Sequence, residues 1–317
     1  MRTKSYRVIL SAIEQKIYSV GSRIAIYTLQ KGRFTRIARY EELRNPAWIA
    51  LSRDERLLAG INTSGRIMVF DTQTGSILLQ SAGTKRESHN LYFFDEDRQL
   101  ICKDWDGRIF TLDLQTGKFS VFPQKTAMGA FLDTETSGRF ISFSEYELSE
   151  ENRRLIIEEV DSAAATVTEV FTIDGIAGTL AEMTRAGGHI YFFIDYFDGS
   201  SDVSVYDIQK RTLKRLLKLK GFCPQEFGRK NMGYPVKICP SPDEKYLVIG
   251  YSSWSLIYDT EKQSVVNLIE IPYFSYVKFM KEPGKVLIGT WEKMVITDFE
   301  HLLKSPALED PQRGRKR

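Results

Sequence analysis

The feature that most constrains this chain is an internal repeat. One clear copy runs from Ala47 to Leu79 and the next from Leu91 to Phe122, and each reads as four short apolar segments separated by turns. Ser64-Gly65 and Asp106-Gly107 signal tight hairpins, because these residue types accept positive φ in two-residue connections. Ile, Val, Leu, Phe and Tyr dominate the segments, and helical periodicity is nearly absent. The repeat therefore predicts antiparallel units of four strands each.

Two independent markers count seven such units along the chain. The residues expected to end the third strand recur at intervals of 39 to 52 residues. They are Thr28, Asp71, Asp113, Asp161, Asp207, Asp259 and Asp298. The residues expected to begin the second strand give the same count, at Lys16, Arg56, Gln99, Arg139, His189, Lys245 and Lys285. A period of roughly 40 to 45 residues with four strands per unit is the signature of a β-propeller blade.

We therefore expect an all-β fold, a seven-bladed β-propeller of four-stranded antiparallel blades. The blades are expected at about 6–40, 47–80, 90–122, 129–173, 179–219, 236–271 and 274–304, in a single domain spanning 1–304, followed by a flexible basic tail at 305–317. One such sheet cannot cover both of its faces, whereas stacked blades bury each other. The last unit has only three clear strands, so we expect either a weak fourth near Leu302 and Leu303 or closure helped by the N-terminal segment.

The ends of four third strands resemble those of the WD40 and YVTN-type repeat families. Four dipeptides stand where Trp-Asp usually stands, namely Phe70-Asp71, Leu112-Asp113, Tyr206-Asp207 and Tyr258-Asp259. The segment from Ser241 to Tyr246 also looks like the first hairpin turn of such blades. The resemblance extends over about residues 6 to 300 at the level of the superfamily, and it implies the same propeller fold.

Departures from the repeat indicate where function lies. In a propeller, the loop between the second and third strands opens on the same face as the connection to the next blade, and insertions there are the usual functional signal. The sequence inserts Glu145–Arg154 in unit four and Asp195–Asp202 in unit five, and its longest connection is Lys220–Pro235. We expect all three to project from one face.

Aromatic residues gather at these loop positions. Aromatic and Arg side chains often dominate binding energy at the centre of an interface. The candidate binding residues are Trp105, Tyr146, Tyr196, Phe197, Phe227, Arg229, Tyr251, Trp254 and Trp291. The competing interpretation is that these rings cap the blade cores or plug the central channel. Acidic loops beside Arg229 and Lys230 would make the face electrostatically mixed, which suits a protein or peptide better than a polyanion.

Composition and charge exclude several other classes. The formal net charge is +3, and the tail supplies +2 of it through four basic side chains less Glu309 and Asp310, so nucleic-acid binding is expected only through the tail. Three cysteines without a paired spacing favour a reducing compartment, and we expect a cytoplasmic protein. No apolar run has the length of a membrane span. Three scattered histidines predict no metal centre, and we expect no cofactor.

The sequence thus predicts a non-catalytic interaction scaffold that binds a protein or peptide on the insertion-bearing face. A channel-centred enzyme, hydrolase or lactonase-like, is the first alternative, with Lys237 and Lys278 as residues that could face the channel. A structural subunit that uses the blade flanks is the second. The partner's identity and the oligomeric state have no signal in the sequence.

Overall fold

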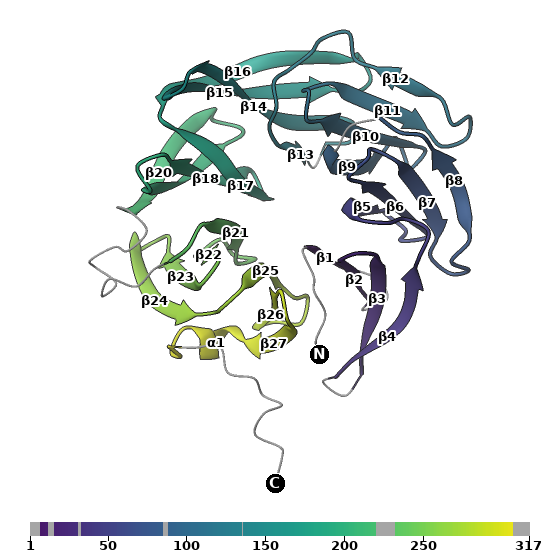
Figure 1. Ribbon diagram of the computed structural model, residues 1–317. Coiled ribbons are helices and arrows are strands. Elements are labelled where there is room, and N and C mark those ends of the chain that lie inside the picture. The colour runs from purple at the N-terminus through teal and green to yellow at the C-terminus, as the bar shows by residue number, and fades with distance from the viewer. Residues whose placement is uncertain are drawn as a thin grey trace. The chain divides into compact units, whose positions relative to one another are not determined.

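The computed structural model describes residues 7–11, 16–30, 33–84, 88–134, 136–219 and 232–306. Its strands form seven antiparallel sheets, and the described part of the chain has one short helix, α1 (Phe299–Leu302). In each sheet the strands lie in chain order, as Figure 1 shows. The chain divides into two compact units, and the boundary falls between Ile176 and Ala177.

The first unit, Arg7–Ile176, contains four blades of four strands each. Blade 1 has β1 (Arg7–Leu10), β2 (Lys16–Val20), β3 (Ile24–Gln30) and β4 (Arg33–Tyr40). Blade 2 has β5 (Pro46–Leu51), β6 (Leu57–Asn62), β7 (Ile67–Asp71) and β8 (Ile77–Ser81). Blade 3 has β9 (Ser88–Phe94), β10 (Gln99–Asp104), β11 (Ile109–Asp113) and β12 (Phe119–Val121). Blade 4 has β13 (Phe131–Asp133), β14 (Arg139–Ser149), β15 (Asn152–Asp161) and β16 (Thr166–Ile176).

The second unit begins at Ala177 and contains three blades. Blade 5 has β17 (Gly178–Ala186), β18 (His189–Tyr196), β19 (Ser201–Asp207) and β20 (Thr212–Leu219). Blade 6 has β21 (Pro235–Pro240), β22 (Tyr246–Tyr251), β23 (Trp254–Asp259) and β24 (Ser264–Glu270). Blade 7 has β25 (Phe274–Phe279), β26 (Lys285–Thr290) and β27 (Met294–Asp298). The expected fold class, an all-β seven-bladed propeller, is confirmed, with three strands instead of four in the sheet of blade 7.

Of the two alternatives for the last blade, the fourth strand near Leu302 and Leu303 is wrong, and closure helped by the N-terminal segment stays a prediction, because residues 1–6 lie outside the described residues. Leu302 lies in α1 and is fully buried in an apolar cluster with core residues of blades 6 and 7. The chain then follows β24: the Asn267 side-chain amide donates to the carbonyls of Leu302 (2.6 Å) and Ser305 (2.9 Å), and the Glu270 N–H donates to that of Pro306 (3.0 Å). These contacts draw the segment onto the outer edge of blade 6 instead of onto β27.

The recurring aspartate at the end of the third strand has a local cause. Asp71 Oδ1 accepts hydrogen bonds from the N–H groups of Gln73 (2.9 Å) and Thr74 (2.7 Å), so the side chain closes the turn into the fourth strand. Equivalent bonds are made by Asp113, Asp161, Asp207 and Asp259. The apolar or aromatic residue that precedes the aspartate is buried in all five of these blades, as in Phe70. Each such dipeptide therefore places a buried core residue directly before an aspartate that caps the turn.

A second recurring turn joins the first and second strands in blades 2 and 6. In blade 6 the Ser241 hydroxyl donates to Asp243 Oδ1 (2.5 Å) and accepts from the Tyr246 N–H (3.0 Å), while Glu244 adopts a positive φ of 56°. Glu244 then reaches the preceding blade, where its Oε2 contacts His189 Nδ1 (2.8 Å) and accepts from the Tyr191 hydroxyl (2.7 Å). In blade 2 the equivalent carboxylate likewise accepts a hydrogen bond from the preceding blade. These carboxylates tie adjacent blades together at this end.

Candidate functional site

The loops at the opposite end of the second unit are joined by main-chain hydrogen bonds. In the loop between β22 and β23 of blade 6, the Ser252 N–H donates to the carbonyl of Tyr234 (2.9 Å). Ser252 in turn accepts from the Phe274 N–H (3.1 Å), and the Trp291 N–H donates to the carbonyl of Tyr273 (3.0 Å). The two strand 2–3 loops and the two interblade connections therefore form one continuous, backbone-fixed series.

Four aromatic residues lie in or next to these hydrogen-bonded loops and connections. We call Tyr234, Trp254, Tyr273 and Trp291 the aromatic loop surface. The rings of Tyr273 and Trp291 stack with centroids 6.4 Å apart at an interplanar angle of 27°. Their exposed fractions are 58% and 44%. Tyr273 also has a positive φ of 59°, a strained conformation for a bulky residue.

The sequence pointed to Trp254 and Trp291 as binding residues but missed Tyr273. Trp291 is exposed, whereas Trp254 is half-buried and packs against the core shared by blades 5 and 6. Tyr273 follows Pro272 in the short connection before blade 7, and this Pro-aromatic pair between two strands was the available signal. Tyr234, at the end of the predicted insertion Lys220–Pro235, is exposed.

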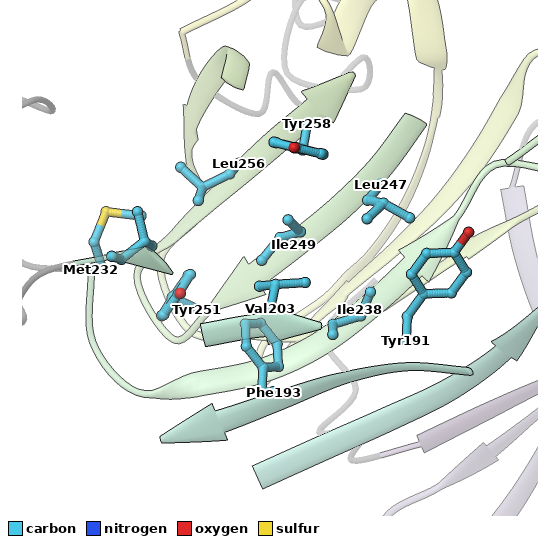
Figure 2. Close-up of a cluster of buried hydrophobic side chains, with 11 residues drawn as sticks. Tyr191, Phe193, Val203, Met232, Ile238, Leu247, Ile249, Tyr251, Leu256 and Tyr258 are labelled. Atoms are coloured by element: carbon cyan, nitrogen blue, oxygen red, sulfur yellow. The ribbon is translucent and has the colours of Figure 1, made fainter. Parts of the chain in front are cut away.

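Tyr251 does not belong to this surface, which corrects the prediction for that residue. Its side chain is 3% exposed and lies in the core cluster drawn in Figure 2, where its ring meets Phe193 edge-on at 5.5 Å. The hydroxyl lies 2.8 Å from Ser201 Oγ, and burial raises the pKa of Tyr251. Tyr251 ends β22 on the face that packs against blade 5, so its ring is inside.

On the β18–β19 turn of blade 5, Tyr196 is half-buried and Phe197 is 51% exposed. The Tyr196 hydroxyl donates to Asp202 Oδ2 (2.8 Å), which also pairs with Arg215 Nε (2.7 Å). Burial and this carboxylate raise the pKa of Tyr196 to about 12, and Lys218 Nζ lies over its ring at 5.1 Å. Tyr196 is therefore held in place, and Phe197 is the more exposed ring of this turn.

Two predicted residues lie in the first unit. Trp105, on the β10–β11 turn, is 44% exposed. Tyr146 is half-buried on β14, and burial together with the charges of Glu158 and Glu169 raises its pKa. The insertion Glu145–Arg154 does not form a loop: it lengthens β14 and β15 into a hairpin. Phe227 and Arg229 lie outside the described residues.

A buried polar network joins blades 3 and 4 within the first unit. Lys103 on β10 is 2% exposed, and its Nζ donates to Ser142 Oγ (2.8 Å), Ser144 Oγ (3.0 Å) and the carbonyl of Phe143 (3.3 Å). Ser144 Oγ donates to Glu158 Oε2 (2.5 Å). Burial lowers the pKa of Lys103 to about 7, against the raising effect of the Glu158 and Asp104 charges. The ammonium group therefore sits at a large desolvation cost.

Groups suited to catalysis are few in the residues that the structure describes. No cluster of three His, Cys, Asp or Glu side chains there has the arrangement of a metal site. Burial raises the pKa of both Cys102, to about 12, and Cys239, which disfavours the reactive thiolate. On the first strands of blades 5 and 6, Lys237 forms an ion pair with Glu182. No helix in the described ranges is long and apolar enough to cross a membrane.

Comparison with known proteins supports the fold alone. No protein-family model matches the sequence, and no curated protein matches it. Among solved structures, the chain is similar to hydrazine synthase of Kuenenia stuttgartiensis, with a TM-score of 0.74, 12% identity, and coverage of 94% of this chain and 96% of that one. It is also similar to the β-propeller domain of Cps50 (Swd1) from Myceliophteria thermophila, with a TM-score of 0.69, 12% identity, and coverage of 94% and 98%. Identities this low show the fold alone, and the expected β-propeller fold agrees with both structures.

Proposed function

We propose that this chain is a non-catalytic scaffold that binds a protein or peptide through the aromatic loop surface. The observation that carries the proposal is the exposed Tyr273–Trp291 stack on loops fixed by main-chain hydrogen bonds. A rigid aromatic pair presents a large contact area and loses little conformational entropy on binding, which is why such rings act as anchors. Phe197, Phe227 and Arg229 remain predicted contributors in the same unit, and Trp105 and Tyr146 remain predicted binding residues of the first unit.

Charge around the stack favours a polypeptide ligand. Glu292 adjoins Trp291, Glu270 ends β24 just before the connection that carries Tyr273, and both carboxylates are exposed. Acidic groups at this position repel phosphate backbones. They suit a partner that offers basic and apolar side chains together.

Peptide selection on the immobilised full-length chain tests the proposal directly. Peptides recovered from a displayed random library are synthesised, and their affinities are measured by calorimetry for the wild type and for two variants. Trp291→Ala removes one ring, and Tyr273→Asn removes the other while keeping a residue that tolerates positive φ. We expect each change to weaken binding at least about tenfold, as for an interface anchor. Trp254 is unsuitable because its truncation would also open the core.

Leu78→Ala is the matched control, since Leu78 is an exposed apolar residue on the outer strand β8 of blade 2. Unchanged affinity in this control, with loss in both ring variants, supports the aromatic loop surface. Unchanged affinity in the ring variants would contradict it. Weaker binding in Leu78→Ala would instead favour the blade-flank alternative, for which the exposed outer-strand residues Ile37, Ile77 and Val121 provide further contacts.

A further inference from the structure

We infer that the basic C-terminal segment of this chain is an internal ligand of the Tyr273–Trp291 stack. The inference rests on the proposed function in that it assigns regulation to the same surface. The occupant is Arg313–Arg317, whose guanidinium groups would lie on the two rings when no partner is bound. Binding of a partner then requires displacement of this segment.

The place where the described chain ends supports this occupant. Pro306 is held on β24 by the bond from Glu270 N–H (3.0 Å), and the Asn267 amide donates to the carbonyls of Leu302 and Ser305, which precede it. Glu270 precedes Tyr273 by three positions in the sequence, and it pairs with Trp254 across the sheet. Pro306, the last of the described residues, therefore lies beside the end of β24, three positions before Tyr273.

Chain length and charge fit the same occupant. Arg313 follows Pro306 by seven residues, which can span about 25 Å when extended, so the rings are within reach. Four of the last five residues are basic, and the exposed Glu270 and Glu292 lie close in sequence to Tyr273 and Trp291 respectively. Arg side chains stack on aromatic faces and are attracted by their quadrupoles. Tethering raises the effective concentration to the millimolar range, so a weak contact is still populated.

The test uses full-length protein labelled with 5-fluorotryptophan, whose four Trp residues give separate fluorine resonances. Trp291→Phe assigns the resonance of interest. The tail variant changes Arg313, Arg315, Lys316 and Arg317 to Ser. The control variant removes the same charge at four exposed basic positions elsewhere, Arg36, Lys118, Lys125 and Lys214.

We expect the tail variant to shift the Trp291 resonance and the control variant to leave it unchanged. Added salt should move the wild-type resonance in the same direction as the tail variant, because ions screen the attraction. A Trp291 resonance unchanged by the tail variant overturns the inference. A shift that disappears on dilution also overturns it, because the tail would then come from a second copy.

Peptides selected for the aromatic loop surface give a second readout. If the tail occupies the rings four-fifths of the time, its neutralisation tightens peptide binding about fivefold, since apparent affinity scales with the free fraction. Equal affinities for wild type and tail variant contradict the inference. Failure of the inference with Trp291-dependent peptide binding intact leaves the proposed function standing. A tail-dependent shift without any Trp291-dependent peptide would reject the proposed function alone.

Discussion

Replacing the buried Lys103 by Met should change how the stability of this protein depends on pH. The Met side chain is similar in length and has no charge, so the change isolates the cost of burying the ammonium group. In the folded protein, burial lowers the pKa of Lys103 from 10.5 to about 7. In the unfolded chain the side chain keeps its ordinary pKa, so between these two values the unfolded state binds the extra proton.

The sign and size of the effect follow from this difference. Where the unfolded state binds more protons, the free energy of unfolding rises with pH. The full difference corresponds to on the order of 5 kcal/mol, at about 1.4 kcal/mol for each pKa unit. Between pH 6 and pH 8.5 the Lys103 contribution amounts to about 2 kcal/mol, with greater stability at the higher pH. In Lys103→Met this contribution is absent.

Several groups face Lys103 and enter the comparison. Glu158 and Asp104 attract the ammonium group. The Ser142 and Ser144 hydroxyls and the Phe143 carbonyl accept hydrogen bonds from it. Removing the charge leaves these acceptors without a donor, so the absolute stability of the variant includes their cost. The pH dependence of the difference between variant and wild type is therefore the decisive quantity.

Urea unfolding of both proteins, followed by circular dichroism at intervals from pH 6 to pH 8.5, measures that difference. The wild type should gain about 2 kcal/mol relative to Lys103→Met across this range. Raised tyrosine and cysteine pKa values act at higher pH and are shared by the two proteins. Parallel curves would refute the reasoning, because they would mean that Lys103 is charged in the folded state over the whole range.

Three further changes test the turns and the interblade contacts. Gly107→Ala should destabilise the protein by about 1–3 kcal/mol in a thermal melt, because φ is +78° and a Cβ would lie 2.2 Å from the Thr126 carbonyl oxygen; an unchanged melting temperature would show that this turn relaxes freely. Turn hydrogen bonds lower the pKa of Asp71, so the ionised carboxylate stabilises the fold above about pH 4, and this stabilisation is lost on acidification. Asp71→Ala should therefore make the free energy of unfolding fall less steeply at acid pH. An equally steep fall in the variant would contradict the capping role. Double-mutant cycles between Glu244→Gln and Tyr191→Phe should give a coupling energy of about 0.5–3 kcal/mol, and purely additive effects would exclude the interblade bond.

The sequence predicted the blade count because local chemistry repeats with the blade. Asp71 and its equivalents act on their own turn, within three residues, so the signal survives without knowledge of the tertiary contacts. Position within a blade is likewise local, which is why six of the seven third strands end at the expected aspartate. The exception, Thr28, lies inside β3, where no aspartate ends the strand.

Exposure of the loop aromatics was harder to predict, because it depends on the neighbouring blade. Tyr251 and Tyr273 both occur next to strand ends, yet one ring packs on Phe193 of blade 5 and the other stacks on Trp291 in solvent. The insertion around Tyr146 was expected to be a loop, but its residues pair along the whole length of β14 and β15. Strand extension and ring burial are tertiary outcomes that no local pattern records.

The two ends of the blades in the second unit differ in which atoms hold them together, and this difference bears on function. At the Glu244 end, side chains make the bonds between blades, so a substitution there removes a structural contact. At the Trp291 end, backbone groups make the bonds between loops, and these bonds persist whatever side chain is present. Side chains such as Tyr273 and Trp291 are therefore not needed to connect the loops, and their exposed rings carry a cost in solubility that folding does not offset. That separation is what a recognition surface requires, since its contacts can be tuned without loss of the scaffold.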